Sequence, residues 1–149
     1  CTGGLVAKCI TDLPGASGVF KGGVVSYTNE VKHGVLGVPR ELLDQFGAVS
    51  PQVAEAMARG ARRVLGADLA VSTTGVAGPD PDDRGNPVGL VYVALAGPDF
   101  CHVRELHLGG VRESIRIRAA GSAFDLIRRY LTGLDLNESD GRRFADRLP

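Results

Sequence analysis

Hydrophobic and polar positions along the chain follow two periods, one typical of helices and one typical of strands. Helical spacing is clear over residues 2–13, where Val6, Ile10 and Leu13 share one face before Pro14-Gly15 ends the segment. Apolar spacing and turn residues elsewhere predict further helices over 39–46, 51–65 and 112–134, and strands over 19–27, 68–74, 88–96 and 101–108.

The predicted helices and strands alternate along most of the sequence. Residues 88–96 and 101–108 are joined by a short Gly-Pro-Asp turn, which favours a hairpin. Alternation of this kind predicts an α/β layered domain with a mixed sheet. The length and the absence of a repeat or linker predict one domain over 1–134, followed by a polar tail over 135–149.

The charge and cysteine content narrow the class of protein. Lysine plus arginine and aspartate plus glutamate both number 17, whereas nucleic-acid binders tend to be basic. No apolar run approaches the roughly 20 residues of a membrane helix. Three cysteines without a zinc or redox spacing predict reduced thiols in a cytoplasmic protein with no structural metal.

Two glycine-containing stretches have the character of ligand-binding loops. Thr2, Gly3 and Gly4 open the first predicted helix, where backbone N–H groups and the helix dipole favour an anion. Residues 72–79 follow a predicted strand, at the sheet edge where open α/β folds bind ligands. The alternatives are an ordinary helix start and an ordinary exit from a strand.

A third candidate site brackets the strand predicted over 19–27. Ser17 lies in a small-residue turn before it, Tyr27 lies at its end, and Lys32 lies in the polar segment that follows. A strand of this length spans about 30 Å, so Ser17 and Lys32 meet only if the Ser17 loop folds back. On spacing alone, the alternative interpretation is that Lys32 is a surface lysine and Tyr27 a half-buried strand residue.

The order of the motifs resembles a known family. Arg112 comes last, after CTGG, PGASGVF, GVVSYTNEVK, LGVP, GAVS, GARRVLGADLAV, TGVAGP and NPVGLVYVALAGP. This series closely resembles the C-terminal domain family of CinA, the competence/damage-inducible protein, over about residues 1–134. The resemblance implies a three-layer α/β/α domain whose mixed, mostly parallel sheet has about five strands.

Free-standing members of that family are nicotinamide mononucleotide (NMN) deamidases, so the resemblance implies hydrolysis of NMN to nicotinate mononucleotide and ammonia without metal or cofactor. It places Ser17 as nucleophile, Lys32 as base, Tyr27 as proton relay and Arg112 as a cation for the oxyanion or phosphate. We expect Asn29 to orient the lysine or the carboxamide. We expect the phosphate on Thr2, Gly3 and Gly4, and the ribose and pyridine against Thr74, Gly75, Ala77 and Gly78.

The resemblance also implies a homo-oligomer that binds neither membrane nor nucleic acid. The alternative function is a nucleotide-binding module that has lost catalysis. A DNA-related role, suggested by the family name alone, conflicts with the zero net charge.

The sequence departs from the family pattern at three places. The pattern has a helix, a strand and a serine before the residue matched by Cys1, so we expect an N-terminal strand and helix to lie outside this sequence. Asp80, Asp82 and Asp83 replace glycines in the loop after 72–79. Ala16 replaces a second serine beside Ser17, which leaves one hydroxyl in that turn.

Overall fold

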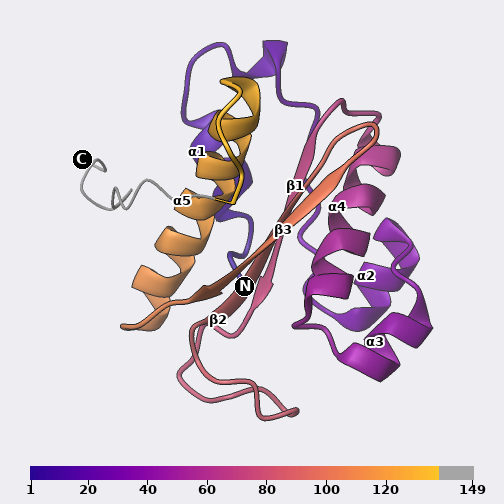
Figure 1. Cartoon of the computed structure of the whole chain (residues 1–149), viewed down its shortest axis with the longest axis vertical. Helices are drawn as coiled ribbons and strands as arrows, with labels where there is room; N and C mark the ends of the chain where they lie inside the picture. The colour runs from indigo at the N-terminus through magenta and orange to yellow at the C-terminus, as the bar shows by residue number, and fades with distance from the viewer. Residues whose placement is uncertain (138–149) are drawn as a thin grey trace.

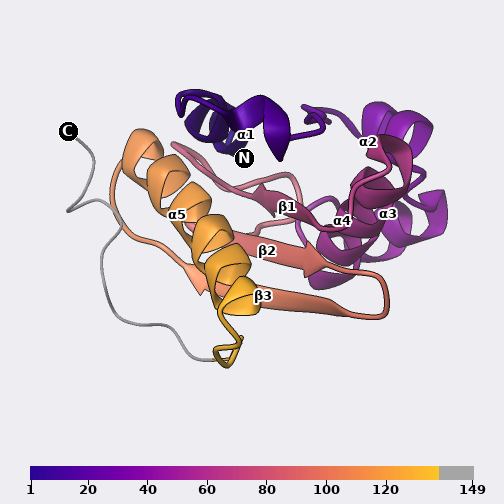
Figure 2. The same ribbon diagram turned by 90° about the horizontal axis from the view of Figure 1, so that it is seen from above.

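The computed structural model describes residues 1–137 and shows a sheet between two layers of helices (Figures 1 and 2). One face of the sheet carries α1 (Leu5–Thr11) and α5 (Arg112–Leu131). The other face carries α4 (Pro51–Leu65), against which α2 (Asn29–Leu36) and α3 (Arg40–Phe46) pack. A short 3₁₀ turn, η1 (Ala16–Gly18), follows α1. The α/β/α layering expected from the sequence is therefore confirmed.

The sheet itself differs from the expectation. It contains β1 (Ala70–Gly75), β2 (Leu90–Ala96) and β3 (Cys101–His107), in the order β1-β2-β3 with both pairings antiparallel. The β2–β3 hairpin was expected and is confirmed. The prediction of about five mostly parallel strands is wrong for residues 1–137, where the sheet has three strands and no parallel pairing.

Residues 19–27, predicted to form a strand, are extended but do not join the sheet. No backbone hydrogen bond between this segment and β1 is found in the part of the chain that the structure describes. The Val19 and Val25 side chains are 83% and 57% exposed. The prediction of a strand over 19–27 is therefore wrong for the described residues, because ladder hydrogen bonds require a paired neighbouring strand within about 5 Å.

Capping residues mark the ends of two helices on the α4 side of the sheet. Ser50 caps α4 by accepting a hydrogen bond from the Val53 N–H, and Gly66 ends the helix in a left-handed conformation. The polar segment after Tyr27, where no helix was predicted, forms α2 with Thr28 as its N-cap. Lys32 lies on the buried side of this helix and not on the surface.

No helix within residues 1–137 has the length and hydropathy to cross a membrane. The same residues contain no cluster of three or more His, Cys, Asp or Glu side chains that could hold a metal ion.

The contact between α2 and α4 depends on Gly60. A β-carbon at this position would lie 2.0 Å from the Leu36 carbonyl oxygen, which also accepts a hydrogen bond from Arg63. Replacement of Gly60 by alanine is expected to lower the free energy of unfolding by about 1–3 kcal/mol, because the two helices must separate. Urea denaturation measures the change.

Gly34→Ala in α2 is the matched control for Gly60→Ala. Nothing lies within 4 Å of a β-carbon at position 34, so the better helix propensity of alanine should raise stability by about 0.5–1 kcal/mol. Equal effects of the two substitutions would contradict this account of the α2–α4 contact.

Candidate active site

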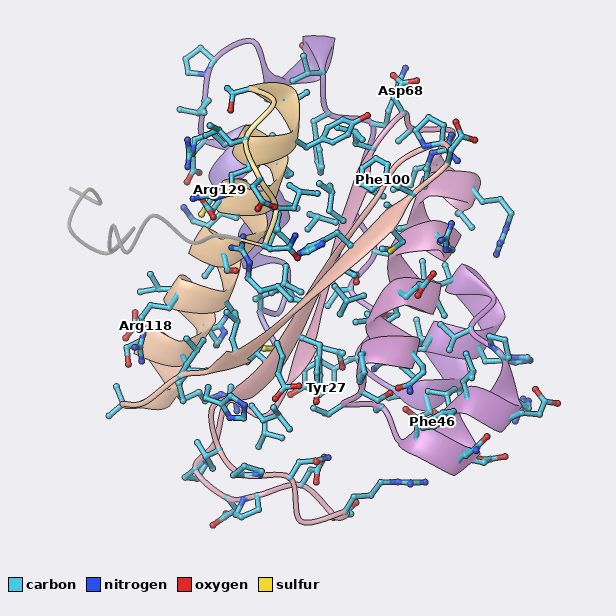
Figure 3. All side chains as sticks on the ribbon, in the orientation of Figure 1. Tyr27, Phe46, Asp68, Phe100, Arg118 and Arg129 are labelled. Carbon is cyan, nitrogen blue, oxygen red and sulfur yellow. The ribbon has the colours of Figure 1, made fainter. Side chains whose placement is uncertain are left out.

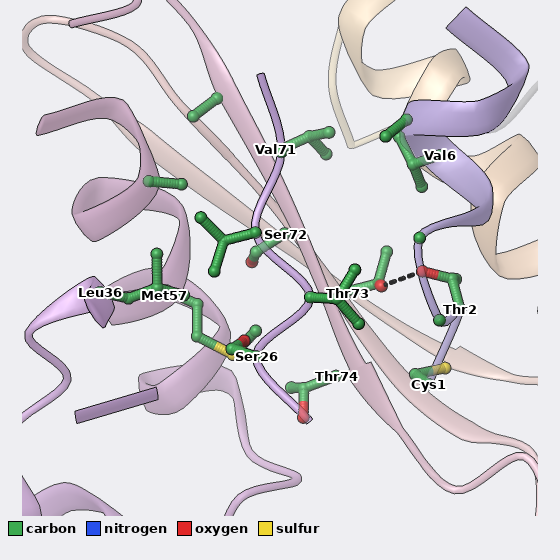
Figure 4. Close-up of a pocket in the computed structure, with 18 of the residues that line it drawn as sticks. Cys1, Thr2, Val6, Ser26, Leu36, Met57, Val71, Ser72, Thr73 and Thr74 are labelled. Atoms are coloured by element: carbon green, nitrogen blue, oxygen red, sulfur yellow. Dashed lines mark hydrogen bonds between the residues drawn. The ribbon is translucent and has the colours of Figure 1, made fainter. Parts of the chain in front are cut away.

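A cavity of about 1000 Å³ runs along the outer edge of β1, between that strand and residues 19–27 (Figure 4). Its volume is at the upper end of the roughly 300–1,000 Å³ range of ligand sites. Side chains from both helix layers close it, including Val6 and Phe124 on one side and Leu36, Met57 and Leu65 on the other. The middle of the cavity is therefore apolar.

Lys32 lies at one end of the cavity and is buried. Its side chain is 6% exposed, and Nζ donates a hydrogen bond of 2.9 Å to the Ser26 carbonyl oxygen. Burial lowers the pKa of Lys32, while the negative charge of Glu30 opposes this shift without an ion pair between the two. The surface-lysine alternative is therefore wrong.

Three cations border this end of the cavity. Lys32 and Arg112 line the cavity together with Cys1 and Thr2, and Arg116 donates a hydrogen bond to the Thr2 carbonyl oxygen.

The wall of this end is built from the turn before α1 and the loop after β1. The Thr2 hydroxyl shares a hydrogen bond of 2.9 Å with the Thr73 hydroxyl (Figure 4), and the Thr74 hydroxyl donates to the Ala48 carbonyl oxygen. Arg112 donates from Nη1 to the Gly78 carbonyl oxygen at 2.6 Å. The predicted site residues that line the cavity are Thr2, Gly3, Gly4, Tyr27, Lys32, Thr74, Gly75, Ala77, Gly78 and Arg112.

Tyr27 and Asn29 are placed differently from the expectation. Tyr27 lines the cavity but its side chain is 70% exposed, so it is a residue of the cavity mouth and not a half-buried one (Figure 3). Asn29 is in the first turn of α2 and faces a separate surface pocket of about 140 Å³ with His33 and Arg40. Asn29 therefore does not meet the cavity.

Ser17 is not brought to Lys32. It lies in η1, at the end of the molecule near Asp68, whereas Tyr27 is at the opposite end of the sheet (Figures 1 and 3). Hydrogen bonds from Gly18 to Gly15 and from Phe20 to Ala16 close the turn on itself. The expectation that this loop folds over toward Lys32 is wrong for the described structure, and Ser17 does not line the cavity.

Sequence reasoning did not single out Arg116 or Ser26, although both adjoin this end. Arg116 donates a hydrogen bond to the Thr2 carbonyl oxygen, and the Ser26 carbonyl oxygen accepts one from Lys32. The available signal for Arg116 was its position one helical turn after Arg112 on α5. Ser26 had no comparable signal, because its contact with Lys32 depends on how α2 packs.

Comparison with known proteins identifies the family. Residues 1–131 match the family model of the CinA C-terminal domain. A CinA-like protein of Syntrophomonas wolfei is 57% identical over 131 residues, covering 88% of this chain and 32% of the relative. A putative competence-damage inducible protein of Caldanaerobacter subterraneus is 53% identical over 137 residues, covering 92% of this chain and 33% of the relative. The chain thus spans about one third of the length of these relatives.

Comparison with solved structures supports the same family assignment. The competence/damage inducible protein CihA of Agrobacterium tumefaciens is 40% identical with a TM-score of 0.83, covering 86% of this chain and 79% of that one. The competence damage-inducible protein A of Klebsiella pneumoniae is 28% identical with a TM-score of 0.87, covering 91% of this chain and 84% of that one. The motif order, the α/β/α layers and these matches together show that the chain belongs to the CinA C-terminal domain family.

Proposed function

We propose that the cavity binds a nicotinamide nucleotide and that its cationic end hydrolyses the carboxamide of NMN. The observation that carries this proposal is Lys32, a buried amine of lowered pKa that faces a cavity of nucleotide size. An amine acts as a general base only when it is neutral, and burial shifts its equilibrium toward that form. The closed apolar middle of the cavity suits a pyridine ring.

We infer the identity of the nucleophile from the position of Cys1. Because Ser17 does not line the cavity, it has no route to a carboxamide held near Lys32. The residue that precedes Cys1 in the family pattern is a serine, and Cys1 lines the same cavity as Lys32 and Arg112. We therefore assign the nucleophilic hydroxyl to that serine in a chain that carries it, and not to Ser17.

The proposed reaction proceeds through an acyl-enzyme. The neutral Lys32 amine takes the proton of the serine hydroxyl as the oxygen attacks the carboxamide carbon. Arg112 stabilises the oxyanion of the tetrahedral intermediate, and Lys32 returns the proton to the leaving nitrogen as ammonia departs. Water, deprotonated by Lys32, then releases nicotinate mononucleotide. Tyr27 at the cavity mouth contacts the substrate or relays the proton.

Ammonia release from NMN between pH 6 and 9 tests this function. We expect release by a chain that carries the serine-bearing segment ahead of Cys1, at a rate that rises with pH as Lys32 loses its proton. The rise should lie below the pH range of an ordinary lysine, because burial lowers the Lys32 pKa. A rate of ammonia release that does not change with pH would exclude Lys32 as the general base. If the folded chain that carries the serine-bearing segment releases no ammonia, the proposed amidase activity is wrong.

A nucleotide-binding module without catalysis is the second candidate. The position of Ser17 favours it, because within residues 1–137 the serines that line the cavity are Ser26, whose own backbone carbonyl oxygen accepts from Lys32, and Ser72, whose hydroxyl donates to the Ala54 carbonyl oxygen. Calorimetric binding of NMN without ammonia release, in both the 149-residue and the extended chain, would support the module.

A further inference from the structure

The side chain of Arg84 connects the loop between β1 and β2 to the end of α3. This loop, residues 76–89, lies at the lower end of the sheet in Figure 1. Arg84 Nη1 donates a hydrogen bond of 3.2 Å to the Gln45 carbonyl oxygen. Nη2 donates to the carbonyl oxygens of Leu43 and Asp44. Because the carbonyl groups of a last helical turn carry the negative end of the helix dipole, a guanidinium is stabilised there.

The turn after α3 leaves room for this side chain. Gly47 ends the helix with a φ of +79°, and a β-carbon there would lie 2.6 Å from Arg84 Cδ. The next residue, Ala48, lines the cavity, and its carbonyl oxygen accepts a hydrogen bond of 2.6 Å from the Thr74 hydroxyl. Arg84 therefore binds the loop to a part of the chain that is itself fixed to β1 at the cavity wall.

The loop around Arg84 is closed by its own hydrogen bonds. The Asp82 carboxylate accepts from the Arg84 N–H at 3.1 Å and from the Asn86 N–H and Nδ2 at 2.8 Å each. Residues 79–81, Pro-Asp-Pro, connect this closed turn to Gly78. Each proline ring fixes φ near about −65°, which limits how far the connecting backbone can bend. The position of the Arg84 turn therefore constrains the position of Gly78.

The Gly78 carbonyl in turn holds Arg112. It accepts a hydrogen bond of 2.6 Å from Nη1, the one side-chain hydrogen bond that Arg112 makes within residues 1–137. Arg112 also forms no ion pair with a carboxylate among the residues that the structure describes. The direction of its guanidinium therefore depends on where the loop places the Gly78 carbonyl oxygen.

We propose that Arg84 is a positioning residue, which holds the loop against α3 so that the Gly78 carbonyl directs Arg112 into the cavity. The proposal rests on the proposed function, in which Arg112 stabilises the oxyanion. Stabilisation of this kind requires donors that are fixed in place before the reaction, and a displacement of about 1 Å can cost about 10²-fold in rate. Arg84 is itself exposed and does not line the cavity, so its effect passes through Gly78 and Arg112.

Hydrogen exchange in the 149-residue chain tests this positioning without requiring catalysis. In Arg84→Gln, we expect amide exchange in the loop to become at least about tenfold faster, because its contact with α3 is lost. The guanidinium protons of Arg112, followed by NMR and assigned with Arg112→Lys, should also exchange faster with water. Arg84→Lys should recover part of both effects, since an ammonium group can still bind one carbonyl oxygen of α3.

Arg62→Gln is the matched control. Arg62 also donates to a backbone carbonyl oxygen, that of Asp68 at 3.1 Å, but Asp68 lies at the opposite end of the molecule from the loop (Figures 1 and 3). This variant should leave loop exchange and the Arg112 guanidinium protons as in the wild type. Unfolding midpoints of all variants separate a local change in the loop from a general loss of stability.

The kinetic test uses the chain that carries the serine-bearing segment ahead of Cys1. Arg84→Gln is expected to lower kcat for ammonia release from NMN by about 10–10²-fold, because Arg112 acts on the transition state. The KM should stay within about twofold of the wild-type value, since the interaction that is lost is made in the transition state. Arg84→Lys should restore part of kcat, and Arg62→Gln should have the wild-type rate.

Two results would contradict the positioning role. One is wild-type exchange of the loop in Arg84→Gln, and the other is faster exchange of the loop with no change in the Arg112 guanidinium protons. If the wild-type extended chain releases no ammonia, the amidase is wrong, and the Arg112 protons still decide whether Arg84 positions that side chain. If ammonia is released and Arg84→Gln raises KM without lowering kcat, the role assigned to Arg84 is wrong and the amidase stands.

Discussion

Replacement of Lys32 by methionine is expected to lower the rate of ammonia release from NMN by about 10²–10⁴-fold, the usual contribution of a general base. Methionine keeps an unbranched apolar side chain of similar length in the buried site but cannot accept a proton. The measurement is the steady-state rate of the chain that carries the serine-bearing segment ahead of Cys1. The expected loss is in kcat, because Lys32 acts on the nucleophile and not on substrate affinity.

Lys21→Met is the control for this experiment. Lys21 also lines the cavity, but it is exposed and lies in the same extended segment as Tyr27, away from α2. The same chemical change there should alter kcat by less than about threefold, since no proton transfer depends on it. Similar losses in the two variants would indicate a general effect of positive charge and would contradict a base role for Lys32.

Replacement of Asp125 by alanine is expected to lower the free energy of unfolding by about 3–5 kcal/mol, because it takes a carboxylate partner away from the buried Arg129 guanidinium. The Asp125 carboxylate is bound by Arg104, Arg128 and Arg129 at 2.8–3.0 Å. Arg129, labelled in Figure 3, is 2% exposed and loses the Asp125 carboxylate in the variant, although its other contacts remain. Urea denaturation at neutral pH gives the value.

The same carboxylate makes stability dependent on pH. Burial by itself raises the pKa of Asp125, but the hydrogen bonds from Arg128 and Arg104 outweigh it and hold the pKa below its usual range. The stabilisation is therefore present above the unfolded pKa of about 3.9 and is lost as the pH falls through the lower folded value. Asp12→Ala, which removes the exposed ion pair with Lys8, should cost at most about 1 kcal/mol. A cost for Asp125→Ala no larger than this would contradict the buried network.

Much of the fold follows from local signals that the sequence carries. Ser50-Pro51 and Gly66 fix the ends of α4, and the Gly-Pro-Asp turn fixes the β2–β3 hairpin. The α2 helix was missed because its apolar spacing is short and its N-cap, Thr28, directly follows a stretch with a strand period. Burial of Lys32 depends on packing of α2 against α4, which no local pattern reports.

The sheet order and the site depended on non-local contacts. Residues 19–27 have strand character, yet whether they pair is decided by what lies beside them in space. The motif match correctly gathered Thr2, Lys32, Gly78 and Arg112 at one cavity. It could not place Ser17, because a small-residue turn before a strand has the same sequence signature whether it folds toward the site or away from it. The expected N-terminal strand and helix remain a prediction, as does the homo-oligomer. Of the predicted tail over 135–149, residues 138–149 lie outside the described residues.

The most direct test of the central claim compares two serines in the chain that carries the family's segment ahead of Cys1. Alanine in place of the serine next to Cys1 should reduce ammonia release from NMN by about 10²–10⁴-fold. Ser17→Ala should leave the rate within about twofold of the wild type, since Ser17 lies outside the cavity. The opposite result, loss of activity in Ser17→Ala and retention in the other variant, would show that the reaction does not take place at the Lys32–Arg112 end of the cavity.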